Sequence, residues 1–261
     1  MGVLHALRRL GWKAGVDIRR LPTGGASTRD VPVELSSKEK DLVTWILESK
    51  YTMGSPQRLF ATALALKHLI SEGRVGSFVE CGVWRGGHSL LAAGIFALND
   101  VENRVFLFDT FAGMTEPTAE DVMAEDGTSA MPLYVAHKDL NYNNWCFASL
   151  DEVRGNFAAR GLLTDRVQFV EGPVEKTLLL ESNLPTQISF LRLDTDFYAS
   201  TVTEMEVLYR RLEVGGVFAV DDYGHWAGAR QAVDEYFQRG STPAPMLNYV
   251  DYTCRIGQRL A

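Results

Sequence analysis

The chain has 261 residues and a formal net charge of −7; 46% of its residues are hydrophobic and 23% are charged. This composition fits a globular protein with one large domain, and the acidic balance argues against a nucleic-acid groove, which needs clustered Lys and Arg. Cys81, Cys146 and Cys254 lie far apart without CxxC spacing, so neither a disulfide framework nor a zinc site is expected, and reduced cysteines favour a cytoplasmic location.

The first 36 residues (1–36) are expected to form an N-terminal arm and a linker. Residues 1–21 mix Leu and Ile with Arg and Lys, so they lack the uninterrupted apolar core of a signal peptide or a membrane span. Prolines and glycines interrupt residues 22–36, which is typical of a linker. We therefore expect no membrane partner and an arm that contacts a second subunit of a homo-oligomer. An amphipathic helix at a membrane surface is the less favoured alternative.

The main domain, residues 37–261, is predicted to begin with two helices. Serines at 36–37 are possible N-caps of the first helix, because apolar residues recur at helical spacing after them. In the second helix, Ser55 fits the N-cap and Pro56 the first helical position, and the pattern stops at Gly73.

From residue 77 onward, strand-like runs alternate with helical patterns. The expected strands are 77–83, 104–110, 167–170, 188–193 and 216–220, and the expected helices are 86–98, 149–161, 174–180, 201–212 and 229–238. This alternation predicts an α/β domain whose mostly parallel sheet is covered by helices on both faces. Residues 112–146 lack clear periodicity, and a stretch of that length is usually functional. Residues 249–259 are expected to add an edge strand or a hairpin.

The first predicted strand ends in an acid that is followed by a glycine-rich turn. Glu80 and Gly82 begin this turn, and Ser89 lies early in the next helix. Ligands of open α/β sheets bind beyond the carboxyl ends of strands, where glycines let the backbone approach them closely. The run matches neither GxGxxG nor a P-loop, so phosphate binding is not favoured. An acid here fits a ligand that carries an amine, such as S-adenosylmethionine (SAM); a plain tight turn is the structural alternative.

Asp109 ends the second predicted strand. An acid in this position commonly accepts hydrogen bonds from ribose hydroxyls. The alternative is a turn or N-cap aspartate, but the two strand ends support each other because both lie where this fold places a nucleoside ligand.

Four carboxylates directly follow two later strands. Asp194 and Asp196 follow the fourth predicted strand, and Asp221 and Asp222 follow the fifth. Neighbouring strands lie about 4.8 Å apart, so these acids are placed to converge on one hard divalent cation. Mg²⁺ prefers oxygen ligands and keeps open positions for water or substrate. The structural alternative is a set of helix N-caps and turn residues.

His225 follows the second pair of acids closely. We consider it as a general base, a substrate contact or an ordinary loop histidine. His5, His68, His88 and His137 have no comparable context, so no functional role is expected for them.

Four segments together resemble the macrocin O-methyltransferase (TylF-type) family. They are residues 51–59 (YTMGSPQRL), 79–87 (VECGVWRGG), 108–114 (FDTFAGM) and 193–198 (LDTDFY). The resemblance covers residues 37–260, and members of the family methylate sugar hydroxyls on macrolides, aminocoumarins and related natural products. It implies a Rossmann-like class I SAM-dependent methyltransferase fold, SAM and Mg²⁺ as cofactors, and a lid at about 112–146 that closes over the substrate.

The resemblance also assigns roles to residues of this chain. The SAM-binding residues that it implies are Thr52, Met53, Glu80, Gly82, Ser89, Asp109 and Ser149. Ser149 is equally explained as a helix N-cap, in a capping box with Glu152. The implied metal ligands are Asp194, Asp221 and Asp222, and Asp196 is the implied general base.

The expected function is transfer of the SAM methyl group to a hydroxyl of a (deoxy)sugar on a glycosylated natural product, a small-molecule partner. In the expected mechanism Mg²⁺ holds two neighbouring hydroxyls and lowers the pKa of one. Asp196 takes its proton, and the oxygen attacks the methyl group in line with the departing sulfur. The alternatives are a Mg²⁺-dependent catechol-type O-methyltransferase acting on an aromatic diol, and a SAM-binding protein that regulates or scaffolds without methylating.

Overall fold

The computed structural model describes residues 31–74, 76–240 and 242–261. The stretch from Glu34 to Ala261 forms one compact unit. Its α-helices include α2 (Ser37–Glu48), α3 (Pro56–Ser71), α4 (Gly87–Leu98), α5 (Met131–His137), α6 (Leu150–Ala158), α7 (Val174–Thr177), α8 (Tyr198–Val207) and α9 (Ala227–Arg239). Its strands include β1 (Ser77–Cys81), β2 (Val105–Asp109), β3 (Val167–Glu171), β4 (Ile188–Leu193), β5 (Leu212–Val220), β6 (Asn248–Tyr249) and β7 (Arg255–Gln258). Most of the predicted N-terminal arm, residues 1–30, lies outside the described residues.

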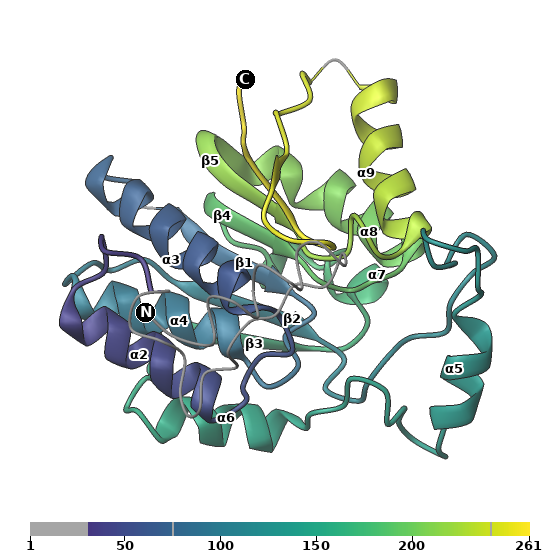
Figure 1. The fold of residues 1–261 in the computed structure, drawn as a ribbon, viewed down its shortest axis with the longest axis horizontal. Helices are drawn as coiled ribbons and strands as arrows, with labels where there is room; N and C mark the ends of the chain where they lie inside the picture. Colours follow the sequence, from purple (N-terminus) through teal and green to yellow (C-terminus); the bar gives the residue numbers. More distant parts are fainter. Residues whose placement is uncertain (1–30, 75, 241) are drawn as a thin grey trace, which may run out of the picture. The chain divides into compact units, whose positions relative to one another are not determined.

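Five strands form a parallel sheet in the order β3–β2–β1–β4–β5, and β7 and β6 add an antiparallel hairpin beside β5. Figure 1 shows α2, α3 and α4 on one side of this sheet and α7, α8 and α9 on the other. The predicted α/β domain, its mostly parallel sheet and its terminal hairpin are thus confirmed.

Side chains alternate between the two faces of the sheet, and this alternation decides which of them reach which helices. Cys81 and Leu193 pack in a core with apolar residues of α7, α8 and α9. The residues just before them in the strands, Glu80 and Arg192, therefore point to the opposite face, where Glu80 meets Ser89 of α4. Polar site residues and core residues thus occupy consecutive positions of the same strands.

The predicted start of α2 is confirmed in detail, and that of α3 in part. Ser36 and Glu39 form a capping box, in which the Ser36 amide donates to the Glu39 carboxylate at 2.7 Å. Pro56 occupies the first turn of α3, as expected. Ser55, however, makes no side-chain cap and donates its hydroxyl to Asp251 in the C-terminal hairpin. Ser55 thus binds a residue that is distant in the sequence and does not cap its own helix.

Residues 112–146 are not uniformly irregular. Their first part is joined to the loops after β4 and β5: the buried Asp121 accepts a hydrogen bond from the Tyr198 amide at 2.7 Å. The Ala124 amide donates to the His225 carbonyl at 2.8 Å. Helix α5, in contrast, has no buried side chain and lies at the margin of the unit (Figure 1). The first part of the segment, its base, is therefore hydrogen-bonded to the rest of the domain, whereas the outer helix α5 buries none of its side chains.

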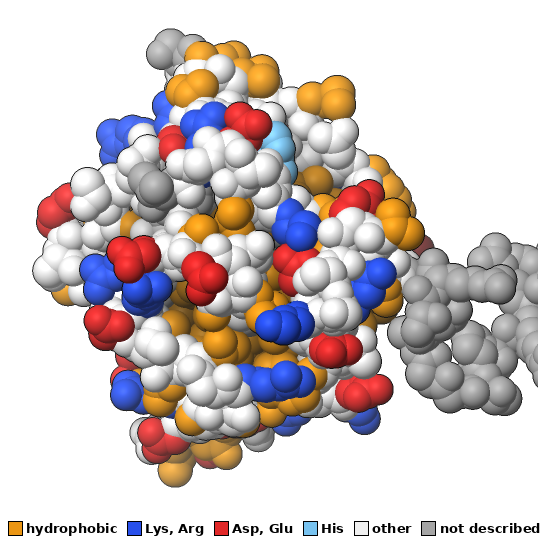
Figure 2. Space-filling model, turned by 90° about the vertical axis from the view of Figure 1, so that its left-hand side faces the viewer, with side chains coloured by type: hydrophobic (Ala, Val, Ile, Leu, Met, Phe, Trp, Pro, Cys, Tyr) orange, Lys and Arg blue, Asp and Glu red, His pale blue; other side chains and the backbone are white. Residues whose placement is uncertain are grey.

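No helix within residues 31–74, 76–240 and 242–261 has the combined length and apolar character needed to cross a membrane. On the face seen in Figure 2, acidic and basic side chains are interspersed. A denser acidic cluster lies in a cavity at the carboxyl ends of the parallel strands.

Candidate active site

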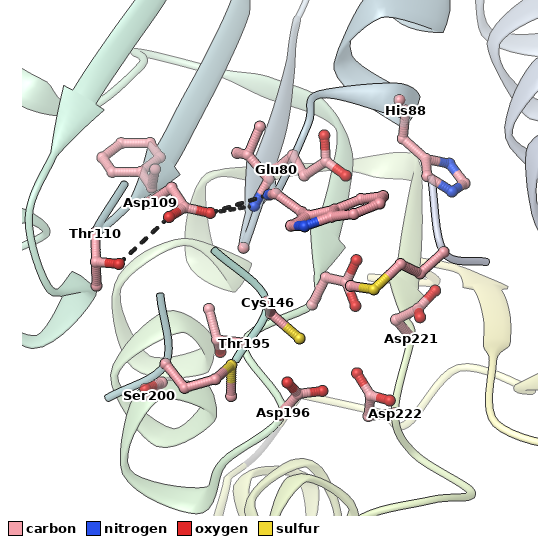
Figure 3. A pocket seen from close by; sticks show the side chains of 18 of the residues that line it. Glu80, His88, Asp109, Thr110, Cys146, Thr195, Asp196, Ser200, Asp221 and Asp222 are labelled. Carbon is pink, nitrogen blue, oxygen red and sulfur yellow. Dashed lines mark hydrogen bonds between the residues drawn. The ribbon is translucent and has the colours of Figure 1, made fainter. Parts of the chain in front are cut away.

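A large cavity opens beyond the carboxyl ends of β1, β2, β4 and β5. It encloses about 1020 Å³ of free space, a volume that includes space open to solvent. In Figure 3, Asp109 lies at one end, Asp221 and Asp222 at the other, and Glu80 between them, which follows the strand order β2–β1–β4–β5. The predicted site residues that line the cavity are Thr52, Met53, Glu80, Gly82, Asp109, Asp194, Asp196, Asp221 and Asp222.

Glu80 is buried in the cavity wall and held by two neighbours. One carboxylate oxygen accepts a hydrogen bond from the Ser89 hydroxyl, and the other accepts one from Arg192 Nε at 3.0 Å. Burial raises the pKa of Glu80 to about 7, against the opposing charge of Arg192. Ser89 itself does not line the cavity; it orients Glu80 from behind. The carboxylate keeps lone pairs with which it can accept a hydrogen bond from a ligand amine.

Gly82 allows the turn after β1 to touch the turn after β4. Its φ of +78° lies in the left-handed region that favours glycine, and a Cβ at this position would overlap the Asp194 carbonyl oxygen. The Asp194 amide also donates to the Cys81 carbonyl at 2.8 Å. The turn after β1 and the turn after β4 are therefore in direct backbone contact beside the cavity.

We expect Gly82→Ala to lower the melting temperature by about 10 °C, because overpacking and a left-handed alanine each cost about 1–3 kcal/mol. Gly73→Ala is the matched control: its φ is +66°, but an added Cβ meets no atom of the described residues within 4 Å. Thermal unfolding of both variants separates the two costs. Equal losses of stability in the two variants would contradict the steric role of Gly82.

Asp109 is engaged by backbone amides on both oxygens. Oδ2 accepts from the Val83 amide at 2.6 Å and the Trp84 amide at 3.2 Å (Figure 3). Oδ1 accepts from the Phe111 amide at 2.7 Å. Burial raises the pKa of Asp109, while these amides oppose the shift. The carboxylate therefore orients the turn after β1.

The three predicted metal ligands do converge. Carboxylate oxygens of Asp194, Asp221 and Asp222 lie within 4.8 Å of one another. Oδ2 of Asp222 is buried and has no hydrogen-bond partner among the described residues. Burial, followed by the charges of Asp196 and Asp221, raises the pKa of Asp222 well above its usual range. An all-oxygen donor set with an unsatisfied buried oxygen fits a hard divalent cation.

Two arginines that the sequence analysis did not single out share this cluster. The buried Arg192 contacts Asp194 at 2.8 Å and Asp221 at 2.6 Å through Nη2, besides its bond to Glu80. Arg58 of α3 binds Asp221 from the other side. With Asp196 and Asp222 included, five carboxyl groups face two guanidinium groups, so not every carboxyl has a cationic partner, and a bound cation would stabilise the ionised form of the others.

Replacing Arg192 by Met is expected to destabilise the fold by about 3–5 kcal/mol, because it leaves buried carboxylates without their partner. For a domain of this size the loss corresponds to a fall in melting temperature of roughly 10 °C. Arg230→Met, at an exposed position of α9, is the control and is expected to have little effect. A melting temperature of Arg192→Met within 2 °C of the wild-type value contradicts the bridging role.

Asp196 occupies the turn after β4 next to the cluster. Its φ of +66° is uncommon for a residue other than glycine. The turn is closed by a hydrogen bond of 2.7 Å from the Phe197 amide to the Thr195 carbonyl. Burial raises the pKa of Asp196 to about 7, against a hydrogen-bonding interaction with Asp222. A carboxylate with such a pKa can exchange a proton with a bound hydroxyl near neutral pH.

Residues 51–54 lie directly on the start of α4. A Cβ on Gly87 would come within 2.6 Å of the Tyr51 carbonyl oxygen, so the glycine is needed for this approach. The Thr52 hydroxyl accepts a hydrogen bond from the Gly54 amide at 3.0 Å. Met53 borders the cavity with a side chain that is 61% exposed. This placement suits a segment that covers a bound ligand.

Besides Ser89, two predicted site residues do not line the cavity. Ser149 caps α6 by accepting from the Glu152 amide at 3.2 Å, and its capping role accounts for it. His225 packs its ring against Trp226 and Tyr252. Burial and then the charge of Arg58 lower the pKa of His225, so its imidazole is neutral at pH 7.

His88, for which no role was expected, does line the cavity. Its ring is buried, Nδ1 lies 3.0 Å from the Thr62 hydroxyl, and Nε2 has no hydrogen-bond partner among the described residues. Burial, with Arg192 and Arg58 adding to it, lowers the pKa of His88 well below its usual value. The signal in the sequence that could have identified His88 is its position directly after the two glycines of the glycine-rich turn.

Over residues 28–259 the chain matches the model of the family described as Macrocin-O-methyltransferase (TylF). The chain belongs to this family. It is therefore a SAM-dependent O-methyltransferase, and the resemblance noted in its sequence is confirmed.

Individual relatives agree with this assignment. The 8-demethyl-8-(2,3-dimethoxy-alpha-L-rhamnosyl)-tetracenomycin-C 4'-O-methyltransferase of Streptomyces olivaceus is 34% identical over 198 residues, 75% of this chain and 71% of the relative. Mycinamicin III 3''-O-methyltransferase of Micromonospora griseorubida is 34% identical over 194 residues, 72% and 71% of the two chains. The solved structure of the O-methyltransferase NovP is 32% identical with a TM-score of 0.70, and the match covers 81% of this chain and 83% of that one. The Rossmann-like class I methyltransferase fold predicted from the sequence is thereby confirmed.

Proposed function

We propose that this O-methyltransferase methylates a hydroxyl of a sugar, such as a deoxysugar, on a glycosylated natural product, in the biosynthesis of an antibiotic, with Mg²⁺ held by Asp194, Asp221 and Asp222. The observation that carries the proposal is the convergence of these three carboxylates beside Asp196 in one cavity. The substrate class is supported by a relative whose name specifies methylation of a rhamnosyl-tetracenomycin.

The residues present fit the proposed cation. Oxygen is their common donor atom, and the three carboxylates outnumber the two arginines beside them. Oδ2 of Asp222 is buried and has no hydrogen-bond partner within the described part of the chain. When bound, Mg²⁺ supplies a Lewis acid that lowers the pKa of a coordinated hydroxyl. Mn²⁺ accepts the same ligands, so the ligand set fits either ion.

The other half of the cavity is assigned to SAM. Glu80, oriented by Ser89 and Arg192, accepts hydrogen bonds from the amine of the methionine part. Gly82 gives the backbone close access, and Asp109 accepts from the ribose. Thr52 and Met53, in the segment that lies against the start of α4, cover the ligand.

Methyl transfer forms one bond to carbon and breaks another, and the proton of the acceptor hydroxyl is transferred as well. SAM carries the methyl group on a sulfonium sulfur. The acceptor oxygen forms a bond to the methyl carbon while the carbon–sulfur bond breaks, and S-adenosylhomocysteine (SAH) leaves. Asp196 receives the proton of the acceptor hydroxyl. Much of the acceleration comes from holding the oxygen in line with the methyl group, and closure of the outer part of the 112–146 segment excludes water.

The test is turnover of SAM to SAH against a panel of deoxysugar-bearing natural products, each with Mg²⁺ and with EDTA. Metal-dependent methylation of a glycoside is the expected result. Caffeate in the same panel represents the catechol-type alternative, and turnover with caffeate but with no glycoside overturns the proposed substrate class. Tight SAH binding without product from any acceptor favours a non-catalytic role.

A further inference from the structure

Glu204 of α8 is a fully buried acid that does not line the cavity. Its Oε1 accepts a hydrogen bond from the Thr195 hydroxyl at 2.9 Å, and its Oε2 has no hydrogen-bond partner among the described residues. Burial raises the pKa of Glu204 to about 8, against the opposing bond from Thr195, so the carboxyl is mostly protonated at neutral pH. Such a group costs free energy in the core of the domain.

Glu204 lies behind the turns that build the site. Thr195 separates the proposed metal ligand Asp194 from the proposed base Asp196, and its hydroxyl is directed to Glu204. Cys81, at the end of β1, adjoins Glu204 as well: burial, and then the charge of Glu204, raises the pKa of the Cys81 thiol well above its usual value. The Glu204 carboxyl therefore lies next to both the end of β1 and the turn after β4, on the side that faces away from the cavity.

The turn that Glu204 meets is one that needs support. A left-handed φ at a residue such as Asp196 costs about 1–3 kcal/mol and persists only where the surroundings hold it. Asp121, at the fixed base of the 112–146 segment, holds one end by accepting from the Tyr198 amide. Glu204 holds the other end through the Thr195 hydroxyl.

We propose that Glu204 is a positioning residue: through Thr195 it holds the turn after β4 so that Asp196 is directed at the acceptor hydroxyl. The inference rests on the proposed role of Asp196 as the base. Stability alone does not explain Glu204, because a well-packed apolar side chain of similar volume is often neutral or stabilising in place of a buried ionisable group.

The test compares Glu204→Met, Glu204→Gln and the control Glu206→Met, which changes an exposed glutamate on the same helix. We expect Glu204→Met to lower kcat about 10–100-fold, the effect of a misdirected catalytic group. We expect this variant to stay near wild type in three other quantities: the KM for the acceptor, the SAH dissociation constant measured by calorimetry, and the melting temperature. Glu204→Gln keeps an uncharged acceptor for the Thr195 hydroxyl and is expected to restore kcat to within about threefold.

A kcat of Glu204→Met within twofold of wild type overturns the proposal. The proposal is also overturned if Glu204→Gln loses as much kcat as Glu204→Met and both variants have lowered melting temperatures, because this result indicates a merely structural role. An active Asp196→Asn variant shows that Asp196 is not the base and overturns the proposal with it. If wild type methylates none of the acceptors tested, the proposed substrate class fails, and the crystal structure of SAH-bound Glu204→Met decides the positioning role. Loss of the hydrogen bond from the Phe197 amide to the Thr195 carbonyl then supports the positioning role, and an unchanged turn overturns it.

Discussion

Replacing Asp196 by Asn is expected to lower the rate of methyl transfer by about 10²–10⁴-fold, the usual contribution of a general base. Asparagine has nearly the same shape but cannot take up the proton of the acceptor hydroxyl. SAH affinity is expected to stay within about twofold, since Glu80 and Asp109 lie on the other side of the cavity. Single-turnover conversion of SAM to SAH, with calorimetry of SAH binding, measures both quantities.

Asp41→Asn is the matched control for this substitution, because Asp41 is exposed on α2 and makes no side-chain hydrogen bond within the described residues. It is expected to retain wild-type turnover. Near-normal turnover by Asp196→Asn, with SAH and Mg²⁺ still bound, contradicts the base assignment. Asp196 would then be a structural member of the acidic cluster.

Removal of the divalent cation is expected to lower turnover by about 10²–10⁴-fold, because a Lewis acid at the reacting oxygen contributes several kcal/mol. EDTA treatment followed by readdition of Mg²⁺ tests this directly. Asp222→Asn removes one proposed metal ligand. It is expected to weaken Mn²⁺ binding by at least about 10–100-fold, which is the usual effect of losing a group that only supports a metal ligand. Paramagnetic resonance of free Mn²⁺ measures that affinity without any acceptor.

Asp165→Asn, at an exposed position just before β3, is the control for Asp222→Asn. Its Mn²⁺ affinity is expected to equal that of the wild type. Turnover that EDTA does not affect would assign Asp194, Asp221 and Asp222 a structural role beside Arg58 and Arg192, and the metal site would be rejected.

Much of the layout of the site was predictable from the sequence. Strand–helix alternation implies a parallel sheet, and the residues that follow parallel strands meet at one edge of it. Glu80, Asp109 and the acids after β4 and β5 each follow a strand-like run, so their convergence required only that the strands pair as neighbours. The convergence of these acids depended on topology more than on side-chain detail.

Local signals were less reliable where a distant partner competes with the near one. Ser55 and Glu152 both stand where a helix cap is expected. Ser55 instead binds Asp251, 196 residues away in sequence, and the Glu152 carboxylate pairs with Arg85 at 2.9 Å rather than closing its capping box. A short-range pattern shows which hydrogen bonds are possible, and the packed chain decides which are made.

By itself the sequence determined the fold class, the family and the strand-end acids, because these follow from periodicity and from motifs that are contiguous in the chain. Only the tertiary structure decided the support of the site by Arg192 and Glu204. Arg192 meets Glu80 because β4 pairs with β1 in the register that sets these two residues side by side. Their meeting depends on the relative position of strands that are 112 residues apart in sequence. Register is set by the packing of the whole sheet, which no local pattern encodes.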